Sequence, residues 1–218
     1  MTESTERLIS ELVENLEPVR PVPRLRSGFA IILSIWATIL GVVLWIQDHE
    51  MGASSLLSNR VYLASFLGLL VASWGGTASA LASGEPGRER FEIGGMGLAL
   101  LGLTVAAVAC LVGIEGLAPT APPMPPGANG MCLQQGVFLS LLPGGVILSF
   151  MSRGWVTHPI RAALMGLAAA GALGAAIIHL SCDVLGAEHL LMGHLGVPLV
   201  LVLLGLYPLG VLLRRLRG

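Results

Sequence analysis

The sequence predicts an all-α, polytopic membrane protein with six transmembrane helices and a short N-terminal cytoplasmic amphipathic helix. Of its 218 residues, 54% are hydrophobic and only 11% are charged. The hydrophobic residues form long runs, and a helix of ~20 apolar residues rises ~30 Å, which matches the hydrocarbon core of a bilayer. The chain contains no lysine, and eleven of its twelve arginines lie in four short stretches that these runs separate.

Six apolar runs are long enough to be spans, and an even number places both termini on one side of the membrane. The runs cover residues 27–46, 61–82, 93–117, 132–151, 160–182 and 190–213. The arginine-rich stretches are residues 7–26, 88–90, 153–161 and 214–217. Short loops rich in arginine stay in the cytoplasm. Both termini and the loops after spans two and four are therefore expected to be cytoplasmic.

This pattern divides the chain into one membrane domain with two polar ends. Residues 1–26 form a cytoplasmic N-terminal arm, residues 27–213 the six-helix transmembrane domain, and residues 214–218 a basic cytoplasmic tail. The loops between spans are too short to build a separate domain. Only the arm is long enough to act outside the membrane.

The spacing of apolar residues in the arm predicts a helix of about twelve residues with one apolar face. Ser4 or Thr5 can cap the start of this helix, and Pro18 ends it. That face consists of Leu8, Ile9, Leu12, Val13 and Leu16. Such a short helix is marginal alone in water, so it needs either the membrane or a protein partner to cover this face. The arm carries five glutamates and one arginine up to Glu17, whereas helices that lie on anionic lipid usually carry basic residues. The charge therefore favours a basic protein partner, and a solvated, frayed tail is the remaining alternative.

Small residues recur every four positions in two of the spans. They are Gly68, Ala72, Gly76 and Ala80 in span two, and Ala162, Gly166, Ala170 and Gly174 in span five. Such ladders let helices approach closely in lipid. The sequence therefore predicts that spans two and five lie in the middle of the bundle. The spans carry no catalytic motif and no mid-membrane charge, which argues against an enzyme and against an ion pathway.

The polar side chains that could perform chemistry gather at the outer ends of the spans. Cys132 begins span four and Cys182 ends span five, at nearly equal distances from the turn that joins these two helices. Antiparallel neighbours bring the two cysteines to about the same depth, where they could form a disulfide in an oxidising compartment. Cys110, deeper in span three, is interpreted as a buried small apolar residue.

A metal site competes for some of the same residues. Its candidate ligands are His179, Cys182, His189 and His194, which suit zinc or a softer ion. His189 and His194 are five residues apart, about 140° around a helix, so a common ligand face requires an irregular first turn. Ordinary hydrogen bonds of structural histidines are the other interpretation.

Motifs along nearly the whole chain resemble those of the NrsF-like family, six-span bacterial inner-membrane proteins that negatively regulate an extracytoplasmic-function sigma factor. The shared features are Pro18-Val19-Arg20 after an N-terminal helix, Cys132 opening span four with Leu142-Pro143 inside it, Arg153-Gly154 with Thr157 and Pro159 in the next turn, an Ala/Gly-rich fifth span, and His179 with Cys182-Asp183. The resemblance implies an anti-sigma factor in the bacterial inner membrane. Its cytoplasmic arm, including Pro18 and Val19, would hold the sigma factor, and its outer cysteines suit a stress sensor.

The predicted function is therefore sequestration of an extracytoplasmic-function sigma factor, with release on a stress sensed at a periplasmic pair, Cys132 and Cys182. The predicted partners are this sigma factor and membrane lipid, without direct contact to nucleic acid. The protein is expected to be a binding protein, not an enzyme, and to carry no cofactor unless the outer histidines and Cys182 bind zinc or a soft metal. The alternative function is a small metal-handling or transport membrane protein that uses the same outer residues.

Overall fold

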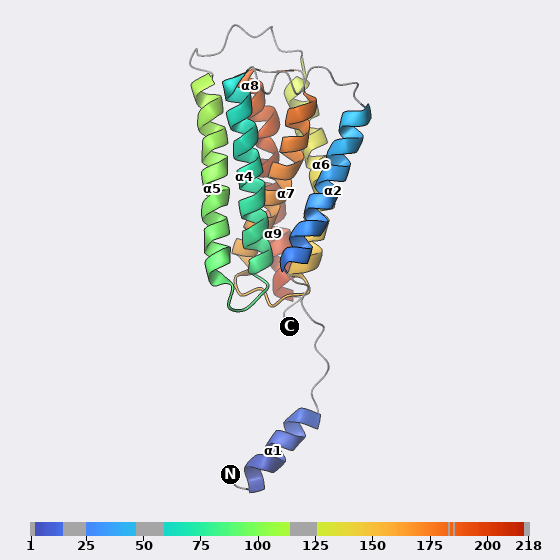
Figure 1. Ribbon diagram of the computed structural model, residues 1–218, viewed down its shortest axis with the longest axis vertical. Helices are drawn as coiled ribbons and strands as arrows, with labels where there is room; N and C mark the ends of the chain where they lie inside the picture. Colours follow the sequence, from blue (N-terminus) through green and yellow to red (C-terminus); the bar gives the residue numbers. More distant parts are fainter. Residues whose placement is uncertain are drawn as a thin grey trace.

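The computed structural model describes residues 3–14, 25–46, 59–113, 126–182, 184 and 186–215. All regular structure in these ranges is helical. The helices are α1 (Glu3–Glu14), α2 (Leu25–Ile46), α4 (Arg60–Ala82), α5 (Glu89–Val112), α6 (Ala128–Met151), α7 (Pro159–Ser181), the short α8 (Ala187–His189), the π-helical turn η2 (Leu190–His194) and α9 (Gly196–Arg215). The long helices stand side by side as one bundle (Figure 1). The all-α fold predicted from the sequence is confirmed.

Six of these helical segments are long and apolar enough to cross a membrane, as the sequence predicts. They are Leu25–Val43, Arg60–Ala82, Glu89–Val112, Ala128–Met151, Pro159–Ser181 and Ala187–Arg215. The ends differ by a few residues. Span three begins at Glu89 and not at residue 93, because the acidic first turn is stabilised at a helix N-terminus. Residues 114–117, which the sequence assigns to the same span, lie outside the described residues.

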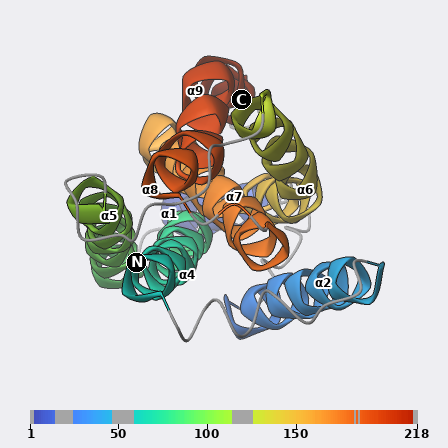
Figure 2. The same ribbon diagram turned by 90° about the horizontal axis from the view of Figure 1, so that it is seen from above.

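Helix α7 forms the centre of the bundle. It packs against α4, α6, α9 and α2, and Figure 2 shows it between them. In α7 83% of the membrane-spanning window is buried, and in α4 56%, against at most 28% in each of the other four spans. Alanines such as Ala172, Ala175 and Ala176 are fully buried. The prediction that spans two and five lie in the middle is confirmed, since small residues permit this close packing.

Four glycines bring the backbones of α4 and α5 into contact. A Cβ atom on Gly75 would lie 2.6 Å from the carbonyl oxygen of Gly95, and one on Gly68 would lie 2.6 Å from the carbonyl oxygen of Gly102. These distances are shorter than any real Cβ contact. Only glycine at these positions allows the helices to approach so closely.

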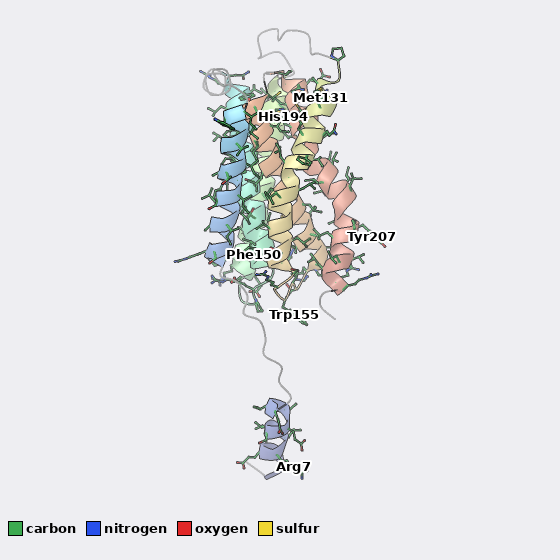
Figure 3. The ribbon with its side chains drawn as sticks, turned by 90° about the vertical axis from the view of Figure 1, so that its right-hand side faces the viewer. Arg7, Met131, Phe150, Trp155, His194 and Tyr207 are labelled. Carbon is green, nitrogen blue, oxygen red and sulfur yellow. The ribbon has the colours of Figure 1, made fainter. Side chains whose placement is uncertain are left out.

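One ion pair ties α5 to α7 at the end of the bundle opposite His194. Glu92 is almost fully buried, and the Arg161 guanidinium donates to its Oε1 atom from both Nε and Nη2 at 2.8 Å. Nearby, the backbone N–H of Trp155 donates to the carbonyl oxygen of Gly84 at 3.1 Å. These contacts connect the loop after α4 and the start of α5 to the turn between α6 and α7. Figure 3 shows Trp155 and His194 at opposite ends of the helix bundle.

Helix α2, which follows the arm, lies at the edge of the bundle (Figure 2). The Trp36 indole Nε1 donates to the carbonyl oxygen of Leu173 on α7 at 3.4 Å. The rings of Phe29 and Trp74 stack with their centroids 5.8 Å apart, which ties α2 to α4. The helix that leads into the arm therefore contacts the central helix directly.

Helix α1 lies apart from the long helices (Figure 1) and confirms the helix predicted in the arm. Its apolar face is exposed, with Leu12 at 61% and Val13 at 60% of full exposure. The other predicted members of this face, Leu16 with the adjoining Pro18 and Val19, lie outside the described residues.

Candidate functional site: a cysteine and histidine cluster

Two cysteines and two histidines meet at one end of the bundle, and we call them the Cys/His cluster. Cys132 comes from the first turns of α6, Cys182 directly follows α7, His189 ends α8, and His194 ends η2. The two sulfur atoms are 3.6 Å apart. One nitrogen or sulfur atom from each of the four residues lies within 4.8 Å of the other three.

The π-helical turn η2 explains why both histidines reach the cluster. In this turn the N–H of Leu195 donates to the carbonyl oxygen of Leu190, five residues earlier, at 3.0 Å. Residues five apart therefore come closer to a common face of the helix, whereas in an α-helix they lie about 140° apart around the axis. The irregular first turn that a common ligand face requires is present, and π-turns are frequent at functional sites.

His189 bridges the cluster to the start of α6. Its Nε2 atom is 3.2 Å from the sulfur of Cys182, and its Nδ1 atom is 2.7 Å from Oδ1 of Asn129. The amide nitrogen of Asn129 donates to the sulfur of Met192 at 3.9 Å. The ring of His189 is buried and held on both edges.

On the side away from the sulfurs, His194 forms a hydrogen bond with another buried histidine, His179 on α7. Their Nδ1 atoms are 2.9 Å apart, and Nε2 of His179 lies 3.0 Å from the carbonyl oxygen of Tyr62 on α4. The hydroxyl of Ser65 is 3.2 Å from the same Nε2 atom. His194 is fully buried, yet its Nε2 atom has no hydrogen-bond partner among the described residues. Such an unpaired buried polar atom costs ~1–3 kcal/mol and calls for an explanation.

The two cysteines are the more exposed residues of the cluster. Both cysteines are partly exposed, whereas the two histidines are buried. The thiol of Cys132 can donate its proton to a thiolate at Cys182, which holds the pKa of Cys182 well below the ordinary value of a thiol.

The structure brings together three of the four metal ligands that the sequence suggests, Cys182, His189 and His194. It adds Cys132 to them and places His179 one step behind, as the partner of His194. Cys110 is buried elsewhere, beside Tyr62 and Leu190. The sequence did not predict the roles of Asn129, Ser65 and Tyr62. They act through a single amide, a hydroxyl and a backbone carbonyl, and none of these groups forms a motif in a sequence.

The exposed face of α1 is a second candidate site. Its apolar residues Leu8, Ile9, Leu12 and Val13 are all exposed. The polar side of the helix is acidic, and its one arginine, Arg7, pairs with Glu11 at 3.4 Å. An exposed apolar face with acidic flanks is suited to a basic surface.

A family model described as NrsF, negative regulator of sigma F, matches residues 12–215. The chain belongs to the NrsF family. The match begins in the last turn of α1, continues through all six spans and includes the whole Cys/His cluster. No curated protein and no solved structure matches the chain. The family resemblance predicted from the sequence is confirmed, and the family's name describes a negative regulator of a sigma factor.

Proposed function

We propose that this NrsF-family protein is a membrane-bound anti-sigma factor that sequesters an extracytoplasmic-function sigma factor through its N-terminal arm. The observation that carries the proposal is the exposed apolar face of α1, together with the six much longer helical segments in the described part of the chain that are apolar enough to span a membrane. A family of negative sigma-factor regulators needs an element that reaches the sigma factor, and α1 supplies one outside the bundle.

The proposed orientation places α1 in the cytoplasm and the Cys/His cluster in the periplasm. Arg88, Arg161, Arg214 and Arg215 lie near the ends of the long helices away from the cluster. Arginine-rich short loops and ends remain cytoplasmic during insertion. The arm then lies on the side of the membrane where a sigma factor is found.

The chemistry of α1 fits a basic groove on a protein. An apolar side chain of the size of Leu or Ile gains ~1.5–3 kcal/mol when it is fully buried, and the face offers four such residues in the described part of α1. The glutamates beside them add electrostatic complementarity to arginine and lysine, which favours fast association and selects against acidic partners.

Release of the sigma factor is proposed to start at Cys132 and Cys182. Cys132 belongs to α6 and Cys182 directly follows α7, and residues 152–158 join these two helices. Modification at the sulfurs would shift these helices against each other, and α2 contacts α7 through Trp36 and leads to the arm.

A sensor built from Cys132 and Cys182 should fail when either cysteine is replaced. Cys132→Ser, Cys182→Ser and the double variant are expected to show the same altered response to a thiol oxidant or a soft metal. Cys110→Ser, the matched control, should respond like the parent. A normal response in the double variant would contradict a role of the pair in sensing.

Retention of the sigma factor tests the arm. We expect Leu12→Glu to release the sigma factor from the protein purified in mild detergent, because the charge would be desolvated in the interface. A cost of ~3 kcal/mol corresponds to about 100-fold weaker binding. Ser10→Glu adds the same charge outside the apolar face and should retain the partner.

Two outcomes would contradict the proposal. One is unchanged retention by Leu12→Glu, and the other is an equal loss in both variants.

The alternative function, metal handling or transport, is favoured by the Cys/His cluster and predicts a bound metal with no co-purifying protein.

A further inference from the structure

We propose that Cys132, Cys182, His189 and His194 bind one tetrahedral metal ion of the zinc class, Zn²⁺ or Cd²⁺, through two thiolates and two neutral imidazoles. The proposal deepens the sensing step of the proposed function, and only the signalling role of the ion rests on that function. Two sulfur and two nitrogen ligands in a tetrahedron are typical of zinc.

The distances fit a tetrahedron. With Zn–S bonds of ~2.3 Å, two sulfur ligands of a tetrahedral ion lie ~3.8 Å apart, and a sulfur and a nitrogen ligand ~3.5 Å apart. The sulfurs of Cys132 and Cys182 are 3.6 Å apart, and Nε2 of His189 is 3.2 Å from the sulfur of Cys182. All four candidate ligand atoms lie within 4.8 Å of one another. Small side-chain rotations would therefore place an ion at bonding distance from each.

The hydrogen bonds around His194 direct a lone pair into the cluster. The carbonyl oxygen of Tyr62 can only accept, so His179 carries its proton on Nε2 and accepts on Nδ1. His194 must then donate from its own Nδ1, which leaves the lone pair on Nε2. This Nε2 is the buried atom that has no partner among the described residues. A metal ion would satisfy it.

The same reasoning applies to His189. The amide nitrogen of Asn129 is the donor toward Met192, so its oxygen accepts from Nδ1 of His189. The lone pair of His189 is then on Nε2, the atom nearest to Cys182. Each of the two histidines thus donates its Nδ1–H, on the side of the ring away from the cluster, to an acceptor. In metal sites this arrangement fixes the tautomer and the orientation of the ring.

The charges balance in the bound state. Zn²⁺ with two thiolates and two neutral imidazoles gives a neutral complex, and each cysteine that is still a thiol before binding releases its proton to water, with no change of oxidation state. A neutral site is suited to the membrane end of a helix bundle, because a net charge would be costly to desolvate there. The partly exposed cysteines provide the route for the ion. Gly193 keeps the space open, since a Cβ there would lie 3.2 Å from Cε1 of His189.

Metal binding to the full chain, purified in mild detergent with a reductant and without a sigma factor, tests the site. Equilibrium dialysis against Zn²⁺ alone should give one ion per chain, and Co²⁺ should give the visible absorption of a tetrahedral thiolate complex. Cys132→Ser, Cys182→Ser, His189→Ala and His194→Ala should each weaken Zn²⁺ binding at least 100-fold. The matched controls Cys110→Ser and His158→Gln should bind as the parent does.

His179 is a positioning residue, and its substitutions separate this role from general packing. His179→Phe cannot accept the proton of His194 and should weaken Zn²⁺ binding ~10–100-fold. His179→Gln can accept and donate at once, so it should retain binding within a few-fold. If a variant does not survive purification, labelling of the cysteines by a maleimide in native membranes replaces dialysis. Zn²⁺ should slow the labelling in the parent and not in His194→Ala.

Three results would overturn the site. They are less than stoichiometric Zn²⁺ in the reduced parent, unchanged binding in Cys182→Ser, and binding that depends on both cysteines but on neither histidine. Failure of this proposal is distinct from failure of the proposed function. Retention of a sigma factor without Zn²⁺ binding would contradict only the metal site, and Zn²⁺ binding without sigma-factor retention only the anti-sigma role.

Discussion

Gly95→Ala is expected to destabilise the bundle, whereas Gly94→Ala, one residue earlier on the same helix, is not. A Cβ atom on Gly95 would lie 2.6 Å from both the carbonyl oxygen of Gly75 and the amide nitrogen of Ser79. A Cβ atom on Gly94 would meet nothing within 4 Å. The same added methyl group therefore probes the contact between α4 and α5 at one site and open space outside the bundle at the other.

The magnitude follows from these distances. Ordinary contact begins at 3.4 Å, so α5 must move away from α4 by about 0.8 Å to admit the methyl group. A gap of that size forfeits a quarter to a half of the dispersion energy of each contact nearby. Overpacking of this kind costs ~1–3 kcal/mol. Gly94→Ala should change the unfolding free energy by less than ~0.5 kcal/mol or raise it, since alanine favours a helix by up to ~1 kcal/mol.

The assay is reversible unfolding of the purified protein in mixed micelles, with tryptophan fluorescence as the signal. We expect the unfolding free energy of Gly95→Ala to lie at least ~1 kcal/mol below that of Gly94→Ala. Equal unfolding free energies for the two variants would refute the backbone contact between α4 and α5.

Two further predictions concern the end of the bundle opposite the cluster. Glu92→Gln should lower the unfolding free energy by roughly 1–3 kcal/mol. This loss is smaller than for a fully buried ion pair, because Arg161 is partly exposed. The double variant with Arg161→Gln should lose less unfolding free energy than the sum of the two single variants. Additivity would show that the pair is not coupled. A reporter inserted at Gly87 or fused after Gly218 should be active as a cytoplasmic protein, and one inserted at Gly127 as a periplasmic protein. A reversal at any one of these positions would contradict the six-span topology.

Span number and core helices could be predicted because membrane thickness and packing in lipid constrain the sequence directly. The ladder from Gly68 to Ala80 identified α4 as central, since close approach requires small residues at the contact. The contact surface of α5 was not predicted. Its buried small residues, Gly95, Ala99, Gly102 and Ala106, are spaced by four, three and four residues, so they do not continue as a four-residue ladder.

The Cys/His cluster was only partly predictable for a different physical reason. Equal depth of Cys132 and Cys182 follows from the length of the chain between them, but the direction of each side chain depends on how the helices rotate against each other. The turn η2 also has no sequence signature, because it changes one set of backbone hydrogen bonds and no residue type. It decides that His194 faces the sulfurs and that His179 lies behind it.

Photocrosslinking in living cells tests the central claim, that the apolar face of α1 binds the sigma factor, most directly. A photoreactive amino acid at Leu12 should form an adduct with the sigma factor, whereas the same residue at Arg7, on the opposite face of α1, should form little or none. Oxidant or soft-metal stress should reduce the Leu12 adduct. An adduct that forms equally at both positions, or a Leu12 variant that crosslinks only to lipid while the sigma factor stays repressed, would contradict the account.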